Sequence, residues 1–294
     1  MTFLSGFIAI VGPPNVGKST LLNRILGKKI AIVSPKPQTT RNRITGIYHE
    51  EDCQMVFMDT PGIHRTQTAL HKSMVNSAQS AFKEVDILVL MIEMFHPQAP
   101  ELPMILSSIR KSKKPSVLVI NKIDKGPKER LLPIIDTYRE ARSVRSIIPV
   151  SALTGDGVES LLRELKSMLR EGPAFFPANV HTDQSESFLV SEMIREKIFL
   201  YTRQELPYSS AVSVEHLEEL PKKNLVSISA RIHVESESQK GILIGQGGKM
   251  IKKIGQAARE DLENFFGNRV FVELLVKVDK NWSKDPRTLR RLGY

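Results

Sequence analysis

The eight residues from Gly12 to Ser19 read G-P-P-N-V-G-K-S, which is the pattern G-x-x-x-x-G-K-[ST] of a phosphate-binding loop. An apolar run, Gly6–Val11, precedes the loop and predicts a buried strand, and a helical pattern that stops at Gly27 follows it. The glycines let backbone N–H groups wrap a polyphosphate, and the helix N-terminus adds positive potential at the same place. In this context Lys18 is expected to reach the β- and γ-phosphates, and the Ser19 hydroxyl to ligate Mg²⁺.

A second motif, D-T-P-G, begins at Asp59 directly after the apolar run Met55–Met58. A carboxylate at the end of such a strand can hold Mg²⁺ through water, and the Gly62 N–H can meet the γ-phosphate. The residue that follows is Ile63, whose side chain has no hydrogen bond to offer. No catalytic base can therefore be named, and catalysis is expected to come from Mg²⁺, Lys18 and the loop amides.

The motif N-K-I-D, residues 121–124, follows the strand-like run Ser116–Ile120 and predicts which base is bound. Guanine presents two donors side by side, and the Asp124 carboxylate can accept from both. Adenine has no amine there, and a buried polar group left unpaired costs roughly 1–3 kcal/mol. Ser151-Ala152-Leu153 follows a further apolar run, and the Ala152 N–H is expected to meet guanine O6.

The polar segment Q-T-T-R-N, residues 38–42, is expected to supply a second hydroxyl ligand to Mg²⁺ when the γ-phosphate is present. The sequence favours Thr40 over Thr39 without excluding Thr39.

Chain length, cysteine content and charge limit the number of domains, the compartment and the kinds of partner. A chain of 294 residues predicts about two domains. The one cysteine, Cys53, suits a reducing cytosol, and no run approaches the length of a membrane span. The formal net charge of +10 favours nucleic acid or an anionic surface, and residues 240–294 carry 12 basic against 6 acidic side chains.

Apolar runs alternate with helical patterns up to about residue 170, which predicts a mostly parallel sheet with helices on both faces. The glycine and two prolines of 172–177 break the pattern, and the order helix, strand, strand, helix, turn, helix, strand follows. We therefore predict an α/β domain over 1–171, a linker over 172–184 and a smaller α+β domain over 185–294 that includes a basic tail. The expected strands are Gly6–Val11, Arg43–Tyr48, Gln54–Met58, Ile87–Ile92, Ser116–Ile120, Ile147–Val150, Ala211–Leu217, Leu225–Glu235 and Arg269–Val278.

The glycine-rich turn of the second domain, I-G-Q-G-G-K-M-I-K-K-I-G, has the G-x-x-G sequence of a KH loop between two helices. Glycines let a sugar–phosphate backbone come close, and the following lysines supply charge. A helix–turn–helix without a ligand is the alternative. The residues expected to bind RNA are Ile244, Gly245, Gln246, Gly247, Gly248, Lys249, Lys252 and Lys253.

Taken together, these motifs and the closing W-S-K-D-P-R-T-L-R-R-L-G-Y resemble the Era family over essentially the whole chain. These bacterial GTPases have a Ras-like P-loop domain followed by a type II KH domain. The resemblance implies binding of GTP or GDP with Mg²⁺, of the 3′ region of small-subunit (16S) ribosomal RNA, and a role in 30S assembly. It also implies slow turnover and a cytoplasmic monomer with some inner-membrane association. Asn15, in the middle of the phosphate-binding loop, resembles a K⁺ ligand of related GTPases, and the alternative is that it only braces the loop.

The resemblance and the motifs together assign roles to residues. Lys18, Thr40 and Gly62 are expected to act in catalysis, and Ser19, Thr40 and Asp59 to hold the metal. The residues expected to bind the nucleotide are Gly12, Asn15, Val16, Gly17, Lys18, Ser19, Thr20, Asp59, Asn121, Lys122, Asp124, Ser151, Ala152 and Leu153. Two other functions stay open: an RNA-binding module in which nucleotide only supports the fold, and an ATP-dependent RNA remodeller, against which N-K-I-D argues.

Overall fold

The computed structural model describes residues 2–36, 39–61, 82–139, 144–292 and 294. The chain divides into two compact units. Of the described residues, the first unit holds 2–31, 40–61 and those from 82 to 183. The second unit holds the rest, which are 184 onward together with 32–36 and Thr39 from the loop that precedes the second strand.

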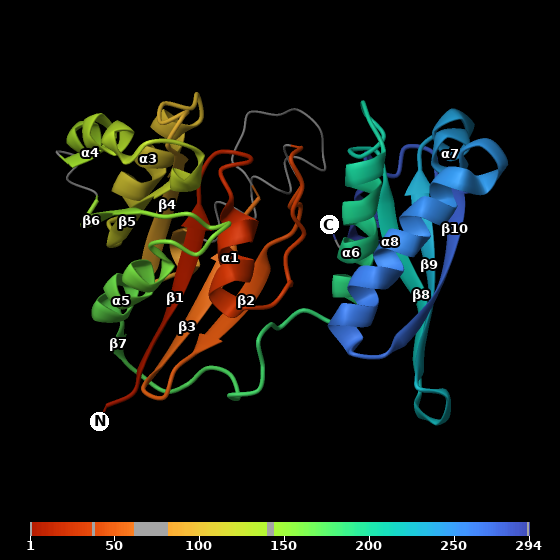
Figure 1. Cartoon of the computed structure of the whole chain (residues 1–294), viewed down its shortest axis with the longest axis horizontal. Helices are drawn as coiled ribbons and strands as arrows, with labels where there is room; N and C mark the ends of the chain where they lie inside the picture. Colours follow the sequence, from red (N-terminus) through yellow and green to blue (C-terminus); the bar gives the residue numbers. More distant parts are fainter. Residues whose placement is uncertain (1, 37–38, 62–81, 140–143, 293) are drawn as a thin grey trace. The chain divides into compact units, whose positions relative to one another are not determined.

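The first unit is built on a mixed, mostly parallel sheet (Figure 1). Along the sheet the order is β2-β3-β1-β4-β5-β6, in which β2 is antiparallel to β3 and the other neighbours are parallel. The short β7 pairs antiparallel with β1. This confirms the predicted α/β alternation. The strands are β1 (Leu4–Val11), β2 (Ile44–His49), β3 (Cys53–Asp59), β4 (Ile87–Glu93), β5 (Ser116–Asn121), β6 (Ser146–Pro149) and β7 (Arg170–Glu171).

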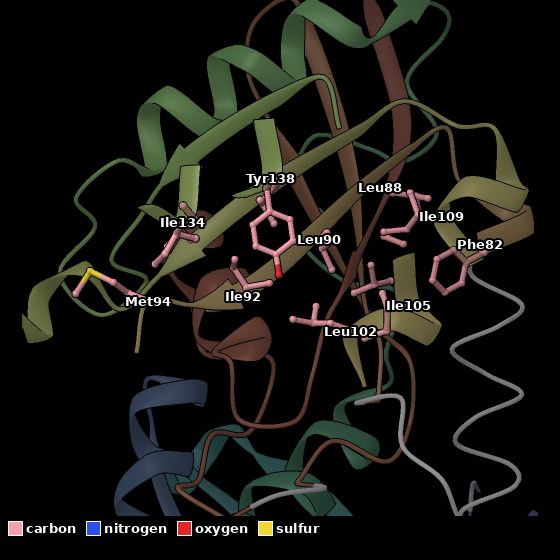
Figure 2. Close-up of a cluster of buried hydrophobic side chains, with 14 of the residues drawn as sticks. Phe82, Leu88, Leu90, Ile92, Met94, Leu102, Ile105, Ile109, Ile134 and Tyr138 are labelled. Carbon is pink, nitrogen blue, oxygen red and sulfur yellow. The ribbon is translucent and has the colours of Figure 1, made fainter. Parts of the chain in front are cut away.

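Helices cover both faces of this sheet, and the strands between them are apolar on both sides for that reason. Figure 2 shows one of the two cores, in which β4 residues Leu88, Leu90 and Ile92 meet Ile105 of α3 and Tyr138 of α4. The helices α1 and α5 also bury apolar side chains, which are Leu21, Leu22 and Ile25 of α1 and Val158, Leu161 and Leu165 of α5. The helices are α1 (Lys18–Leu26), α3 (Leu102–Ser112), α4 (Leu131–Arg139) and α5 (Val158–Met168).

The segment expected as a linker is hydrogen-bonded along the first unit. The fully buried Gln54 side chain accepts from the N–H groups of Phe175 and Phe176 at 2.7 and 3.0 Å. Further along, Ile47 N donates to His181 O at 2.8 Å. Since β2 is an edge strand, the Ile47 bond covers polar backbone that would otherwise invite pairing with another chain.

The second unit is a three-stranded sheet with helices on one face (Figure 1). β9 is central, antiparallel to β8 and parallel to β10. Its element order matches the sequence prediction, and a short C-terminal helix that was not predicted follows. The elements are α6 (Glu186–Tyr201), β8 (Ala211–Leu220), β9 (Leu225–Val234), α7 (Glu237–Ile244), α8 (Lys249–Phe266), β10 (Arg269–Val278) and α9 (Pro286–Arg291). Within the described ranges, no helix is both long and apolar enough to cross a bilayer.

Candidate functional site

The phosphate-binding loop lies between β1 and α1, as the motif requires. Gly17 caps α1 at φ 102°, in the left-handed region that favours glycine, and Asn15 has φ 59°. A Cβ atom at Gly17 would lie 2.3 Å from the Asn121 amide nitrogen. A side chain at position 17 would therefore separate the phosphate loop from the N-K-I-D motif, and this contact explains the glycine beyond its role in wrapping phosphate.

Lys18 is buried at the start of α1, where its Nζ donates to the main-chain oxygens of Gly12 and Pro13 at 3.1 and 2.9 Å. Burial lowers the pKa of Lys18 to about 8, although the nearby Asp59 carboxylate opposes this shift. The loop carbonyls thus hold the ammonium group inside the loop, where an anionic ligand would favour its charged form.

Three oxygen-bearing side chains from separate segments meet beside this loop. The Ser19 hydroxyl donates to Asp59 Oδ2 at 2.5 Å and lies 2.9 Å from the Thr40 hydroxyl. Asp59 is fully buried, its Oδ1 has no hydrogen-bond partner in the described part of the chain, and burial raises the pKa of its carboxyl to about 6. A buried carboxylate with a free oxygen beside two hydroxyls is the donor set that Mg²⁺ prefers, so these residues fit that ion.

Thr39 takes no part in this cluster. Its hydroxyl donates to Lys36 O at 2.8 Å and lies 2.7 Å from the Ser34 hydroxyl, within its own loop. Of the two threonines that the sequence left open, the structure therefore brings Thr40 to Ser19.

The guanine-reading motifs also come together. Asn121 donates from Nδ2 to Val16 O at 2.7 Å and accepts from Ala152 N at 2.9 Å. The Ser151 hydroxyl donates to Asp124 Oδ1 at 2.6 Å, which orients the exposed Asp124 carboxylate. The side-chain amide of Asn121 therefore links the phosphate loop to the S-A-L loop, while Asp124 stays accessible to a base.

Two further residues of this region, Arg24 and Glu93, were not predicted. Arg24 of α1 donates from Nε to Ala152 O at 3.3 Å and from Nη2 to Leu153 O. Lys122, at φ 66°, pairs with Glu93 through Nζ and Oε2 at 2.5 Å. Arg24 looked like an ordinary surface residue of a helix, and no local pattern indicates a partner more than a hundred positions away. Gln38, Gly62 and Ile63 lie outside the described residues.

The G-x-x-G loop of the second unit lies between α7 and α8 (Figure 1). Gly245, Gly247 and Gly248 have φ of 71°, 59° and 78°. A Cβ at Gly245 would lie 2.8 Å from Met250 Cβ, whereas one at Gly247 or Gly248 would meet nothing within 4 Å. Gly245 is thus needed for packing, and the outer side of Gly247 and Gly248 is open to a ligand.

A groove of about 570 Å³ runs between α8 and β10. One face of α8 lines it with Lys252, Gln256 and Arg259, spaced four and three residues apart, and β10 lines it with Phe271 and Leu274. Apolar walls with two cations at the rim suit unstacked bases and their phosphates. Of these residues the sequence singled out Lys252 alone, although the helical spacing from Lys252 to Arg259 was visible in it.

The neighbouring lysines of α8 differ in their surroundings. All three lysines, Lys249, Lys252 and Lys253, are exposed, but the Lys253 ammonium lies 4.4 Å from the ring centroid of Tyr201 on α6. Lys253 is therefore already engaged in a cation–π contact within its own unit.

Comparison with known proteins assigns two separate stretches of the chain to two family models. Residues 7–122 match the family model described as 50S ribosome-binding GTPase, and residues 205–283 match the KH domain. The curated GTPase Era of Syntrophus aciditrophicus is 54% identical over 292 residues, which cover 99% of this chain and 95% of that one. The chain belongs to the Era GTPase family. GTPase Era of Alkaliphilus metalliredigens is 44% identical over the full length of both chains.

Solved structures of Era agree with this membership. A point variant of Aquifex aeolicus Era bound to GDP·AlF4⁻ superposes with a TM-score of 0.96, at 39% identity over 99% of each chain. A second Era structure, in complex with MgGDPNP and nucleotides 1506–1542 of 16S ribosomal RNA, has a TM-score of 0.95 at the same identity and coverage. The predicted fold, a Ras-like α/β domain followed by a KH domain, is confirmed.

Proposed function

We propose that this protein hydrolyses GTP and that the bound nucleotide controls its binding to the 3′ region of 16S ribosomal RNA during assembly of the 30S subunit. The observation that carries this is the pairing, in one chain, of a guanine-reading phosphate site with an open G-x-x-G loop and groove. The Era relative whose structure holds nucleotides 1506–1542 of 16S ribosomal RNA supports the choice of RNA.

The nucleotide site divides its roles among few residues. Asp124, oriented by Ser151, accepts from the two guanine donors, and the Ala152 N–H meets O6. Lys18 neutralises the β- and γ-phosphates from within the loop. Ser19 and Thr40 would hold Mg²⁺ through their hydroxyls, and Asp59 would hold it through water. The metal would supply charge neutralisation on the phosphate oxygens. The Gly62 amide completes the γ-phosphate contacts.

Slow hydrolysis is part of this proposal, because positioning and charge do the catalytic work and Ile63, which follows D-T-P-G in the sequence, offers no hydrogen bond to the attacking water. Asn15, exposed and at φ 59°, is the candidate ligand for K⁺. The functional division follows 1–171 for GTP, 172–184 as connection and 185–294 for RNA. A monomer in the cytoplasm, with a fraction at the inner membrane face, completes the proposal, and the net charge of +10 favours both anionic partners.

One experiment separates this function from its competitors. Single-turnover hydrolysis of GTP and of ATP is measured with and without an RNA that spans the 3′ end of 16S ribosomal RNA. We expect GTP to be preferred by several orders of magnitude and the RNA to change its hydrolysis rate. Equal use of ATP would favour a general RNA remodeller, and a rate that RNA leaves untouched would favour a module in which nucleotide only supports the fold.

The RNA site is tested by the double variant Gln246→Asp/Gly247→Asp. A side chain at Gly247 has open space, and aspartate tolerates its positive φ better than most residues. Two carboxylates against the phosphate backbone should reduce RNA affinity well over tenfold and flatten its salt dependence. GTP affinity should stay within about twofold. Normal RNA binding by the folded variant would contradict the assignment of this loop.

A further inference from the structure

The helix that begins in the phosphate-binding loop also contacts the loop that reads the base. Lys18 is the first residue of α1, and Arg24 lies further along the same helix. From there the Arg24 guanidinium donates through Nε to Ala152 O at 3.3 Å and through Nη2 to Leu153 O. One rigid helix therefore carries the phosphate-binding lysine at its start and holds the S-A-L loop from its side.

The main chain after Ser151 surrounds the Arg24 side chain. The carbonyls of Ala152 and Leu153 accept from the guanidinium, and Gly155, at φ 96°, lies beside the aliphatic stem. A Cβ atom at Gly155 would lie 3.6 Å from Arg24 Cδ, at ordinary van der Waals distance. Since all of these neighbours are main-chain groups, Arg24 acts on the path of the loop backbone.

A continuous chain of polar groups leads from Arg24 to the guanine-reading carboxylate. The carbonyl of Leu153, which Arg24 holds, shares a planar peptide group with the nitrogen of Thr154. Thr154 N donates to the Ser151 hydroxyl oxygen at 3.1 Å, and that hydroxyl donates to Asp124 Oδ1 at 2.6 Å. A rotation of the Leu153–Thr154 peptide would therefore remove a bond from Ser151 and free the hydroxyl that holds Asp124.

Asp124 depends on this support because its side chain is exposed. An exposed carboxylate can turn about its side-chain bonds, and accepting from both guanine donors at once requires one orientation. The Ser151 hydroxyl supplies that orientation through Oδ1. A charged donor makes a stronger hydrogen bond than a neutral one, so the Arg24 guanidinium is a firm anchor for the far end of the chain.

The loop has other bonds that keep it folded. Ser151 N donates to Asp156 O and Gly155 N donates to Ser151 O, both at 2.8 Å, and Val158 N donates to Gly155 O at 3.1 Å. These bonds close the turn within the loop itself and into the start of α5. The particular contribution of Arg24 is to tie this closed turn to α1 and to set the direction of two successive peptide groups.

We propose that Arg24 is a positioning residue for guanine selectivity, which holds the Leu153–Thr154 peptide so that the Ser151 hydroxyl orients Asp124. In this role Arg24 acts through the loop and makes no bond of its own to the base. All the residues concerned belong to the first unit. The inference rests on the proposed role of Asp124 as the residue that reads guanine.

The test compares GDP with inosine diphosphate, whose base lacks the exocyclic amine of guanine. Only a correctly oriented carboxylate gains from that amine, so the ratio of the two affinities reports the orientation of Asp124. Both affinities are measured by titration calorimetry on the full-length chain at one Mg²⁺ concentration. Because neither ligand carries a γ-phosphate, the measurement is independent of hydrolysis.

The decisive variant is Arg24→Met, which keeps a stem of similar length and removes the donors. GDP affinity should fall about tenfold, and inosine diphosphate affinity should fall less, because Asp124 then gains less from the amine. The ratio of the two affinities should therefore narrow by about threefold or more. An unchanged ratio in the folded variant would overturn the proposal, even if both affinities fall.

Arg24→Lys gives an independent reading should Arg24→Met fail to fold. Lysine keeps the charge and the stem but lacks the planar fork that reaches two carbonyls together. The ratio of GDP to inosine diphosphate affinity should narrow again. A parental ratio in Arg24→Lys would contradict the positioning role of the guanidinium.

Lys166→Met is the matched control. Lys166 lies on α5, the helix that follows the S-A-L loop, and pairs with Glu50 and Asp52 at 2.6 Å each. Its loss weakens the first unit without removing a bond to the loop. The free energy of unfolding should fall, while the ratio of the two nucleotide affinities should match that of the parent protein. A narrowed ratio here would show that general weakening of the unit explains the effect of Arg24→Met.

Ser151→Ala tests the route from Arg24 to Asp124. This variant removes the hydroxyl through which Arg24 acts, so it should narrow the affinity ratio by itself. Adding Arg24→Met should then narrow the ratio little further, because both changes break one chain of bonds. Independent effects of the two changes on the logarithm of the ratio would contradict this route.

Asp124→Ala separates failure of this inference from failure of the proposed function. Without the carboxylate, the preference for GDP over inosine diphosphate should nearly disappear. A parental ratio in folded Asp124→Ala would remove the base-reading assignment on which the inference stands. If Asp124→Ala abolishes the preference while Arg24→Met retains it, the positioning role of Arg24 alone is wrong.

Discussion

Asn121 donates its side-chain amide to the main-chain oxygen of Val16 across 2.7 Å, which joins the N-K-I-D motif to the phosphate-binding loop. The same side chain accepts from Ala152 N, so one buried amide ties together three nucleotide-binding segments. The base-reading and phosphate-reading parts of the site are therefore held in register by a side chain of the protein itself.

Asn121→Ala should weaken GTP and GDP alike. The variant leaves Val16 O and Ala152 N without their partner, and each unpaired buried group costs about 1–3 kcal/mol. We expect both affinities to fall between tenfold and several hundredfold, as measured by displacement of a fluorescent guanine nucleotide. RNA affinity in the absence of nucleotide should be unaffected. A loss of affinity for GTP alone would show that Asn121 acts on the γ-phosphate, and it would contradict this interpretation.

Asp124→Asn should change which base is bound. An amide cannot accept from both guanine donors, but its N–H can donate to the 2-oxo group of xanthine. The binding free energy of GTP should become less favourable by a few kcal/mol, which is the range typical for loss of a hydrogen bond to a charged group. Xanthosine triphosphate should become the preferred ligand. Competition binding with the two nucleotides measures this, and unchanged GTP affinity in a folded variant would refute the role of Asp124.

Much of this architecture could be predicted because local sequence patterns indicate it. The strand β4 is buried on both faces and appears as the uninterrupted apolar run Ile87–Ile92, and α8 shows its helical spacing between two glycines. The four nucleotide motifs stand at strand ends, where parallel sheets bind ligands. These features need only neighbouring residues for their recognition.

The contacts that could not be predicted join distant segments through charged side chains. Arg24 lies in a helix, where a charged residue normally indicates a solvated face. Its partners are the main-chain oxygens of residues 152 and 153, and no periodicity links such distant positions.

The thiol of Cys53 should be unreactive in the folded protein. Burial raises the pKa of Cys53 to about 11, and the side chain is inaccessible. Since the thiolate is the nucleophile, modification by a thiol reagent at pH 8 should follow the rate of unfolding and rise sharply in denaturant. Rapid stoichiometric reaction under native conditions would contradict the burial of this residue.

The same shift predicts how stability depends on alkaline pH. The thiol ionises near pH 9 in the unfolded chain and near 11 in the folded protein, so the unfolded state binds fewer protons between these values. The free energy of unfolding should therefore be insensitive to this group below pH 9 and fall as pH rises from 9 to 11. Cys53→Ala should show a smaller fall over that range in denaturant titrations, and an equal fall would assign the effect to other groups.

Lys252 and Lys253 are adjacent in α8 and provide a matched pair for the RNA groove. Lys252 lines the groove with Arg259, whereas Lys253 lies over the ring of Tyr201. Lys252→Ala should weaken binding of the 16S 3′-end RNA about tenfold and reduce the slope of log affinity against log salt by about 1, since one phosphate contact is lost.

Lys253→Ala should change RNA affinity less and instead lower the unfolding free energy by about 0.5–1 kcal/mol through loss of the cation–π contact. Binding titrations at several salt concentrations and denaturant unfolding of both variants distinguish the two effects. Equal losses of RNA affinity with equal salt slopes would show that both lysines contact phosphate and that the groove between α8 and β10 does not define the RNA path.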